Sequence, residues 1–582
     1  MSIPVFPWIY SLIIRGIHLY PWFGTPQKKP TYKQIHRSMK HYLKRLEESI
    51  QAYWENPALG NYGGETFTFG QVATQIEKLH IFFNNAGIEK TEKIALCAKN
   101  TARWGISFLA ANTYEAVVVP ILADFHPDSI KSLVNHSEST ILFTDNDIWP
   151  KLDIKEMPEL KAVISTVDFA LLYSASKDIE DAYKGTDAAF AEKYPSGFSK
   201  DNVSYPCNND KELAIINYTS GTTCMPKGVM LRYECISANV EFGQNRIPST
   251  SKDKIVSMLP MAHMYGLMFE LIYPLCGGSS IYYIGRMPTP AILMGALAEI
   301  KPYLLITVPL VMEKIFKNKL KPVLDKPAMK VLTSIPGVNK LLFKKIRNTL
   351  MNAFGGNIRE IVMGGAALNP DIEKWFKKIG IPYTVGYGMT EAAPLMAYED
   401  WYNFAPKSCG KAIDFVEVRI DSEDPYNVVG EIQARGTNIM SGYYKNEDAT
   451  RAAFTKDGWM NTGDLGLLDK EGNIFIKGRS KNMILSPNGQ NIYPEEIEAV
   501  LNNLPYVLES IVISRGTALV ALAYLDSEKL AENNLDAAQY SKELMKEVNA
   551  QMPAYSKLSA IETVNEPFEK TPKMSIKRFL YM

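Results

Sequence analysis

Small residues, hydroxyls and one lysine follow each other closely between residues 218 and 228, in the order Tyr-Thr-Ser-Gly-Thr-Thr-Cys-Met-Pro-Lys-Gly. In such a stretch, backbone N–H groups can converge on an anion, hydroxyls add donors, and the lysine adds a mobile positive charge. The lysine, Lys227, precedes Gly228, whereas in a Walker A loop it follows the second glycine. Taken alone, the stretch is explained equally well as a phosphate-binding loop and as an ordinary Gly/Ser/Thr turn.

A second glycine-rich stretch, Thr384 to Glu391, ends in a hydroxyl and a carboxylate. A hard oxygen ligand such as Glu391 suits Mg²⁺, which takes one or two carboxylates together with phosphate oxygens and water. The ring of Tyr387 can lie flat on a purine. For this stretch alone, a plain turn with an N-capping threonine is the commoner explanation.

Two further stretches offer parts of a nucleotide site. Residues 461–466 present Asp464 beside glycines, and a carboxylate can accept hydrogen bonds from both vicinal hydroxyls of a ribose. The plain alternative is an Asx turn. Residues 363–368 offer small side chains at which a flat ring can approach the backbone, a signal that is weak alone.

The elements that must position these stretches are strands of a mainly parallel sheet. Apolar runs rich in β-forming residues precede the stretches, and strands alternate with helices in the N-terminal part, which predicts helices on both faces of the sheet. Ligand loops then sit at the carboxyl ends of strands. The expected helices are residues 32–55, 72–86 and 104–114, and the expected strands include residues 94–97, 116–121, 255–260, 280–284, 304–308, 358–363 and 383–385. Residues 168–210 are polar and are expected to form a surface excursion.

The character of the chain changes twice towards the C-terminus. After Gly410, residues 416–420 and 431–435 alternate as half-exposed antiparallel strands do. After Arg479 the pattern predicts a helix over 495–504, a hairpin over 510–525 and a helix over 536–552. A chain of 582 residues exceeds what one core usually organises. We therefore predict an apolar N-terminal segment (1–31), a large domain (32–480) and a small α+β domain (481–582).

Composition narrows the class of protein. Lys and Arg number 63, as do Asp and Glu, so the chain lacks the basic surplus of a nucleic-acid-binding protein. Its six cysteines include no Cys-x-x-Cys pair, which argues against a disulfide framework or a structural zinc and fits the reducing cytoplasm.

Residues 3–23 are apolar and aromatic, but Arg15 and His18 interrupt them. A spanning helix needs about 20 uninterrupted apolar residues, and a secretory signal needs a basic start and a small-residue cleavage site. We favour packing on the protein as a lid, with peripheral contact to the inner face of a membrane as the alternative.

Together, these motifs resemble those of the acyl-adenylate-forming superfamily, which includes the acyl-CoA synthetases, firefly luciferase and the adenylation domains of peptide synthetases. The resemblance runs from about Phe67 to the C-terminus, and residues 254–269 and 364–395 look closest to the long-chain fatty acyl-CoA synthetases. It implies a multi-layered α/β domain with a distorted barrel-like segment, and a small hinged α+β domain. It also implies a two-step reaction that needs ATP and Mg²⁺. In the first step a carboxylic acid and ATP form acyl-AMP and release pyrophosphate. In the second step coenzyme A reacts with acyl-AMP to form acyl-CoA and release AMP.

The resemblance assigns roles to individual residues. Thr219 and Glu391 would hold Mg²⁺ and pyrophosphate, Lys227 would meet the outgoing phosphates, and Asp464 with Arg479 would hold the ribose. The other expected nucleotide contacts are Ser220, Gly221, Thr222, Thr223, Gly365, Ala366, Tyr387, Gly388, Met389 and Thr390.

Further roles concern the acid, the thiol and the hinge. His263 falls where the family places a residue near the acyl carboxylate, Lys481 falls at the hinge, and Gly489 would line the pantetheine tunnel. Within residues 259–276, the apolar sequel to His263 reads as a helix compatible with an aliphatic channel.

Two positions depart from the family's pattern. Cys224 stands where glycine is usual, and Ser575 stands where the family has a lysine that meets the carboxylate and α-phosphate. A serine cannot supply that charge, which leaves Lys573 or Lys577 as substitutes. Two alternatives therefore stay open beside CoA ligation: transfer to a carrier-protein thiol, and a catalytically weak nucleotide or acyl-chain binder. Acyl chain length and oligomeric state are not encoded in these motifs.

Overall fold

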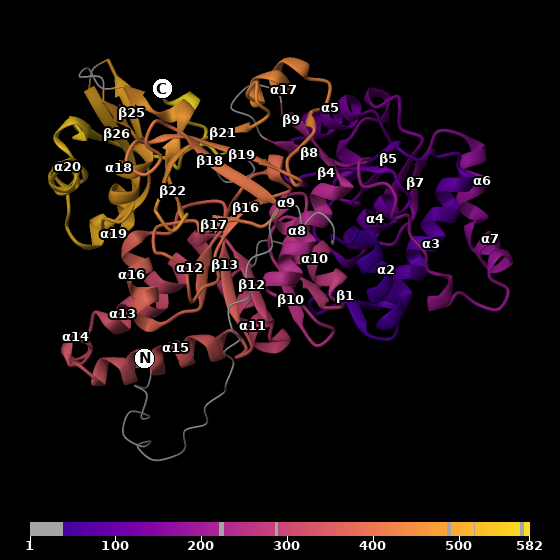
Figure 1. The fold of residues 1–582 in the computed structure, drawn as a ribbon, viewed down its shortest axis with the longest axis horizontal. Coiled ribbons are helices and arrows are strands. Elements are labelled where there is room, and N and C mark those ends of the chain that lie inside the picture. The colour runs from indigo at the N-terminus through magenta and orange to yellow at the C-terminus, as the bar shows by residue number, and fades with distance from the viewer. Residues whose placement is uncertain (1–38, 220–225, 286–288, 486–489, 517, 571–575) are drawn as a thin grey trace, which may run out of the picture. The chain divides into compact units, whose positions relative to one another are not determined.

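The computed structural model describes residues 39–219, 226–285, 289–485, 490–516, 518–570 and 576–582. Its largest sheet has eight strands in the order β20-β9-β8-β4-β3-β5-β6-β7 (Figure 1). The five strands from β8 to β6 run parallel, whereas β9 is antiparallel to both β8 and β20, and β7 is antiparallel to β6. The mainly parallel sheet is confirmed. Its strands are β3 (Lys93–Cys97), β4 (Val117–Ile121), β5 (Ser139–Thr144), β6 (Ala162–Ser165), β7 (Leu171–Ser174), β8 (Leu213–Thr219), β9 (Lys227–Arg232) and β20 (Gly442–Tyr443).

Helices surround this sheet: α2 (Tyr42–Ala52), α3 (Phe69–Asn85), α4 (Ala102–Thr113), α5 (Pro127–Ser137), α6 (Lys177–Lys184), α7 (Thr186–Lys193) and α8 (Tyr233–Arg246). Helix α3 begins three residues earlier than predicted, because Thr68 and Gln71 form a capping box in which each side chain bonds the other's backbone N–H. The predicted helix over 32–55 was too long at its C-terminal end. Within the described residues it is α2, capped by His41 and ending at Ala52; residues 32–38 lie outside them.

The polar stretch 168–210 forms the far edge of the sheet. It supplies strand β7, helix α6 with Ile179 as its buried residue, and helix α7, none of whose residues is buried. The prediction of a surface excursion therefore holds for the two helices, whereas β7 pairs with β6. The strand was missed because its residues are only half-buried and carry little alternation.

Two further sheets pack beside the first. One has the order β10-β11-β1-β2, and the other has the order β12-β13-β14, with all its strands parallel. Their strands are β1 (Pro57–Asn61), β2 (Thr66–Thr68), β10 (Lys254–Ser257), β11 (Ser280–Tyr283), β12 (Leu304–Thr307), β13 (Glu360–Met363) and β14 (Tyr383–Val385). The helices of this region are α11 (Pro290–Ile300), α12 (Pro309–Ile315), α13 (Lys321–Leu324), α14 (Pro327–Ser334), α15 (Val338–Ala353) and α16 (Pro370–Ile379).

The expected barrel-like segment is open in this structure. Its sheets have the orders β15-β16-β17 and β18-β19-β21-β22, and no sheet among the described residues closes on itself, because the outer strands pair on one side only. The strands are β15 (Tyr387–Gly388), β16 (Leu395–Tyr398), β17 (Lys411–Ala412), β18 (Val416–Asp421), β19 (Gly430–Gly436), β21 (Met460–Leu468) and β22 (Ile474–Arg479); helix α17 is Glu447–Ala453. The antiparallel pairing predicted for residues 416–420 and 431–435 is confirmed.

After β22 the chain builds a small unit with its own core. Ile497 and Leu501 of α18 pack with Val512, Leu544 and Val548. The predicted hairpin is confirmed as β25 and β26, and β27 joins it in parallel. The elements are β23 (Ile484–Leu485), β24 (Asn491–Ile492), α18 (Pro494–Leu501), β25 (Val507–Arg515), β26 (Ala518–Leu525), α19 (Ser527–Glu532), α20 (Ala537–Gln551) and β27 (Ala560–Val564). Throughout the parts of the chain that the structure describes, no helix is both long and apolar enough to cross a membrane.

Candidate active site

The first predicted loop joins two antiparallel strands. Strands β8 and β9 form a hairpin in which Thr219 pairs with Lys227, so the two ends of the loop lie opposite each other. Ser220, Gly221, Thr222 and Thr223 lie outside the described residues, as does Cys224. The hairpin fixes where Thr219 and Lys227 stand, at the carboxyl end of the central strand β8.

A tyrosine links this hairpin to the second predicted loop. Nζ of Lys227 lies 4.8 Å from the ring centroid of Tyr443, and the Tyr443 hydroxyl donates a hydrogen bond of 2.9 Å to Oε1 of Glu391. Strand β20 holds Tyr443 in place by pairing it with Val229 of β9. Glu391 is buried in the short 3₁₀ turn Thr390–Ala392, and its carbonyl oxygen accepts from the N–H of Met440. Lys227 and Glu391 are therefore joined through one side chain.

Tyr443 contacts two residues of the candidate site, and sequence reasoning missed it. Nothing in the run Gly442-Tyr443-Tyr444 distinguishes one tyrosine from the other. The position of Tyr443 is set by its pairing with Val229, a residue more than 200 positions earlier in the chain. Burial, followed by the nearby Glu391 carboxylate, raises the pKa of Tyr443, which keeps its hydroxyl protonated as the donor to Glu391.

A third group of contacts centres on Asp464. Oδ2 of Asp464 accepts a hydrogen bond of 2.7 Å from the hydroxyl of Tyr387, and Oδ1 lies 2.8 Å from Nε of Arg479. Asp464 is buried on β21 and pairs in register with Arg479 on β22. Burial raises the pKa of Asp464, while Arg479 and Tyr387 lower it; the charges of Glu495 and Glu391 add to the rise. Because Tyr387 stands four residues before Glu391, its hydrogen bond joins Asp464 to the loop that carries Glu391.

Backbone pairing between β13 and β14 brings residues 363–368 next to the loop that carries Tyr387 and Glu391. Met363 at the end of β13 pairs with Val385 at the end of β14, and the N–H of Gly386 donates to the carbonyl of Met363. Gly365 and Ala366 follow β13 and are exposed. A Cβ on Gly364 would stand 3.1 Å from the ring of Tyr265, so a larger residue there would require this ring to shift by a few tenths of an ångström. Gly388, Met389 and Thr390 continue from Tyr387 towards Glu391.

A buried carboxylate fixes the segment that carries His263. Glu270 is fully buried in a π-helical turn (Leu267–Ile272) between α9 (Met264–Gly266) and α10 (Tyr273–Cys276). Its Oε2 accepts hydrogen bonds from the Ser257 hydroxyl and from the N–H groups of Met258 and Leu259. The carboxyl group thereby caps β10 where the chain turns towards His263, which is half-buried. The predicted helix through Cys276 is present, but its one acidic residue was overlooked.

Glu270 should give protein stability a distinct pH dependence. Burial raises the pKa of its carboxyl group from 4.5 to about 8, although its three hydrogen bonds act in the opposite direction. The folded protein therefore holds a proton that the unfolded chain releases, and the contribution of Glu270 to stability falls as pH rises from about 4.5 to about 8. Glu270→Gln keeps the shape and removes this titration. In thermal unfolding, the Tm of the variant should rise relative to the wild type across that range; a constant difference would contradict the assignment.

The predicted hinge lies where two glutamates of α18 meet β22. Nζ of Lys477 lies 3.0 Å from Oε1 of Glu496, and Nδ2 of Asn482 donates a hydrogen bond of 2.6 Å to Glu495. A Cβ on Gly478 would stand 2.7 Å from Oε2 of Glu495. Lys481 is exposed in the 3₁₀ turn Ser480–Asn482 between these contacts.

The two lysines proposed to replace the family's catalytic lysine differ in what can be said of them. Lys573 lies outside the described residues, as do Ser575 and Gly489. Lys577 forms an ion pair with Glu569, and its N–H donates a hydrogen bond of 2.8 Å to the Glu569 carbonyl. In this structure Lys577 is therefore engaged within the small C-terminal unit.

Family models match nearly the whole described chain. One, described as AMP-binding enzyme, matches residues 46–444, and another, described as AMP-binding enzyme C-terminal domain, matches residues 481–581. The chain belongs to the AMP-binding enzymes. The membership of the acyl-adenylate-forming superfamily that its motifs predict is thereby confirmed.

Individual relatives of this AMP-binding enzyme agree with that placement. Long-chain-fatty-acid–CoA ligase 1 of Saccharomyces cerevisiae is 28% identical over 528 residues, covering 82% of this chain and 74% of the yeast protein. Long chain acyl-CoA synthetase 4 of Arabidopsis thaliana is 27% identical over 539 residues, covering 83% and 79%. The structure of the anthranilate CoA ligase AuaEII with anthranoyl-AMP is 19% identical, with a TM-score of 0.75 over 94% of this chain and 97% of that one. The predicted fold, a large α/β domain followed by a small one, is confirmed.

Proposed function

We propose that this AMP-binding enzyme is an acid:thiol ligase that makes acyl-CoA in two steps. A carboxylate oxygen attacks the α-phosphorus of ATP and pyrophosphate leaves; a thiolate then attacks the acyl carbonyl and AMP leaves. The observation that carries the proposal is the continuous line of contacts from Lys227 through Tyr443 to Glu391, next to Asp464 with Tyr387 and Arg479. An enzyme that binds and activates ATP needs a cation for the phosphates, a carboxylate for Mg²⁺ and a carboxylate for the ribose in one site.

The residues present fit a bound magnesium ion. Glu391 offers a carboxylate and Thr219 a hydroxyl, and both are the hard oxygen donors that Mg²⁺ prefers. The ion would offset the charge of the phosphates, Lys227 would meet the outgoing pyrophosphate, and the loop residues 220–223 would supply backbone and hydroxyl donors. Asp464 would exchange its present hydrogen bonds for those of the ribose hydroxyls.

The proposed acid is a long-chain fatty acid. Support comes from relatives whose names specify that substrate and from the apolar, largely buried segment that follows His263. In the same proposal, residues 1–31, 32–480 and 481–582 are separate parts, and the small domain turns about residues 479–482 between the two steps.

Pyrophosphate exchange with a panel of acids tests the first step. We expect exchange of labelled pyrophosphate into ATP that depends on the added acid and is greatest with long aliphatic acids. If only short acids support exchange, the proposed long-chain substrate is rejected but the proposed reaction is kept. If none of the acids supports exchange, adenylation itself is rejected. Replacing CoA by a holo carrier protein in the second step separates the two thiol acceptors.

A second function is favoured by one observation on the C-terminal residues. Ser575 stands at the position of the family's lysine, and Lys577, a proposed substitute, pairs with Glu569. The protein would then bind nucleotide or acyl chains with weak turnover. Calorimetric binding of ATP without exchange, together with exchange restored by Ser575→Lys, would favour this function over ligation.

A further inference from the structure

One helical segment is strongly basic, although the total charge of the chain is zero. Residues 314–347, which we call the basic helical segment, contain nine lysines and one arginine but a single acidic residue, Asp325, whereas the whole chain has 63 residues of each sign. Asp325 already pairs with Lys321 at 2.5 Å and faces Lys330 at 3.7 Å. The other basic side chains of the segment therefore make a strongly positive surface.

The same segment exposes large apolar side chains. Leu341 is 73% exposed and Val331 60%, and the remaining members of the group are Val323, Leu332, Ile335 and Val338. Most lie on α14, on the turn after it and on the first turn of α15. Soluble proteins rarely gather exposed apolar residues in one place unless the surface has a partner.

These apolar residues are not the core-facing side of their helix. Helix α15 packs Phe343, Ile346 and Leu350 against the hydrophobic core of this region, while Val338 and Leu341 lie on another side, beside Lys344 and Lys345. Helix α15 thus has two apolar sides. One packs against the hydrophobic core, and the other is exposed to solvent beside lysine side chains.

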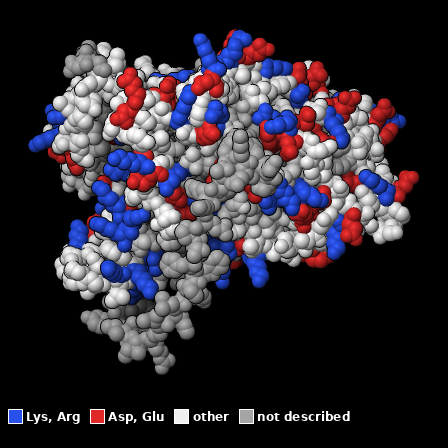
Figure 2. All heavy atoms as spheres, viewed as in Figure 1, with Lys and Arg blue, Asp and Glu red and all other residues white. Residues whose placement is uncertain are grey.

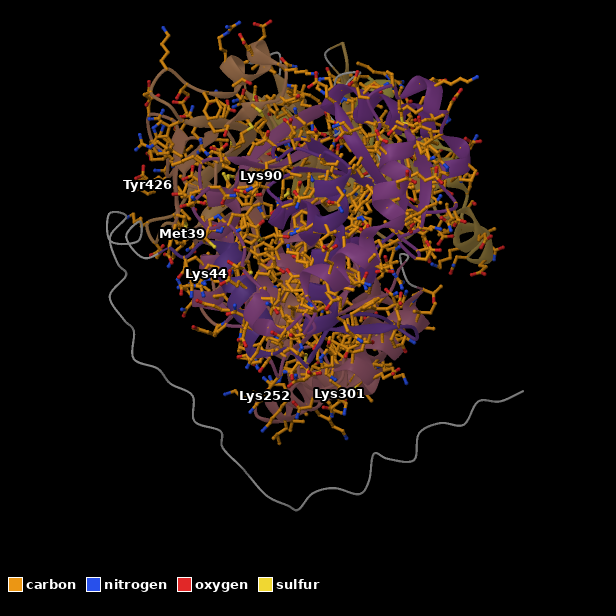
Figure 3. The ribbon with its side chains drawn as sticks, turned by 90° about the vertical axis from the view of Figure 1, so that its right-hand side faces the viewer. Met39, Lys44, Lys90, Lys252, Lys301 and Tyr426 are labelled. Atoms are coloured by element: carbon orange, nitrogen blue, oxygen red, sulfur yellow. The ribbon has the colours of Figure 1, made fainter. Side chains whose placement is uncertain are left out.

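Part of this surface is visible in Figure 2. In Figure 2, blue and white spheres with few red ones occupy the lower left of the molecule, where Figure 1 places α14 and α15. Lys252 and Lys301, both exposed, lie together at the lower end in the side-chain view (Figure 3). Lys301 adjoins the end of α15, because a Cβ on Gly355 would stand 2.8 Å from its Cα.

We propose that the basic helical segment docks the protein on a membrane surface rich in anionic lipid. Lysines near such a surface are attracted to its negative charge, and apolar side chains between them enter the boundary between headgroups and acyl chains. Nucleic acid would use the lysines but leave Val331 and Leu341 in water, so the combination favours lipid. The proposal does not depend on the ligase function. It assigns membrane contact to α14 and α15, and not to residues 3–23.

Sedimentation of the full-length protein with lipid vesicles tests the docking. The wild type should bind vesicles of phosphatidylcholine with phosphatidylserine and not vesicles of phosphatidylcholine alone, and added salt should weaken the binding. Lys340→Glu, Lys344→Glu and Lys345→Glu combined should reduce partitioning by at least about tenfold. Val331→Asp with Leu341→Asp should do the same through the apolar contribution.

Matched controls separate this surface from general charge or hydrophobicity. Lys151→Glu, Lys200→Glu and Lys542→Glu change three exposed lysines elsewhere, and Val167→Asp with Val428→Asp changes two valines that are each 52% exposed. Both control variants should bind as the wild type does, with all Tm values measured alongside. Undiminished vesicle binding by the two docking variants would overturn the proposal, as would a wild type that binds soluble polyglutamate or RNA but no vesicle. No substrate is present, so failure here leaves the ligase proposal untouched.

Discussion

Replacing Glu391 by glutamine should lower kcat of acid-dependent pyrophosphate exchange by about a hundredfold to a thousandfold, the usual effect of removing one charged group that stabilises a transition state. The amide keeps the size of the side chain and can still accept from the Tyr443 hydroxyl, which now donates to Oε1 of Glu391 over 2.9 Å. It removes the negative charge that would hold Mg²⁺ against the phosphates. The loss should therefore appear in turnover, with little change in Tm.

Glu373 provides a matched control for this substitution. It is also buried and accepts a hydrogen bond from a tyrosine, the hydroxyl of Tyr383 at 3.2 Å, but it lies on α16. Glu373→Gln should leave kcat within about threefold of the wild type, in line with the usual context dependence of single interactions. A Glu391→Gln enzyme with unchanged kcat at saturating Mg²⁺ would remove Glu391 from the proposed metal site.

Asp464→Asn should raise KM for ATP by about tenfold to a hundredfold, since hydrogen bonds to a charged group contribute about 1.5–3 kcal/mol. The wild-type carboxylate accepts from Tyr387 and pairs with Arg479, and in the proposed function it exchanges these hydrogen bonds for those of the ribose hydroxyls. The amide carries no charge to hold Arg479, and its NH₂ group meets donors on both sides. Initial rates at varied ATP concentration, with the acid saturating, give the effect directly.

Asp253 is the corresponding control for a buried aspartate–arginine pair. It is 2% exposed and lies 2.6 Å from Arg359, away from the proposed nucleotide residues. Asp253→Asn should lower Tm while KM for ATP stays near that of the wild type. If both variants raise KM alike, the effect of Asp464→Asn reflects general loosening of the fold and not ribose binding.

Much of the candidate site could be proposed from the sequence because its parts are local in sequence. The strand and loop at 213–228, the stretch at 384–391 and Asp464 each carry a short pattern, and their order matches a family. Element boundaries were less accurate where a cap decides them. Thr68 starts α3 three residues before the apolar period suggests, and α2 ends at Ala52, three residues before the predicted end at Glu55.

The parts that sequence reasoning missed depend on contacts between distant segments. Tyr443 gains its place from the pairing of β20 with β9, and no local pattern marks it. Glu270 sits in an apolar run whose periodicity hides the one carboxylate that the end of β10 requires. The apolar side chains of the basic helical segment read as ordinary core residues until the structure shows which of them the core does not use.

The separation of charge along this chain has a consequence for how the molecule meets a charged plane. Because the total charge is zero, the surplus of cations on residues 314–347 must be matched by a surplus of anions elsewhere in the chain. A neutral body with separated charges has an electric dipole moment. Near a negative plane the cations of residues 314–347 are attracted while the matching anions are repelled, and this opposition favours orientations in which α14 and α15 face the plane.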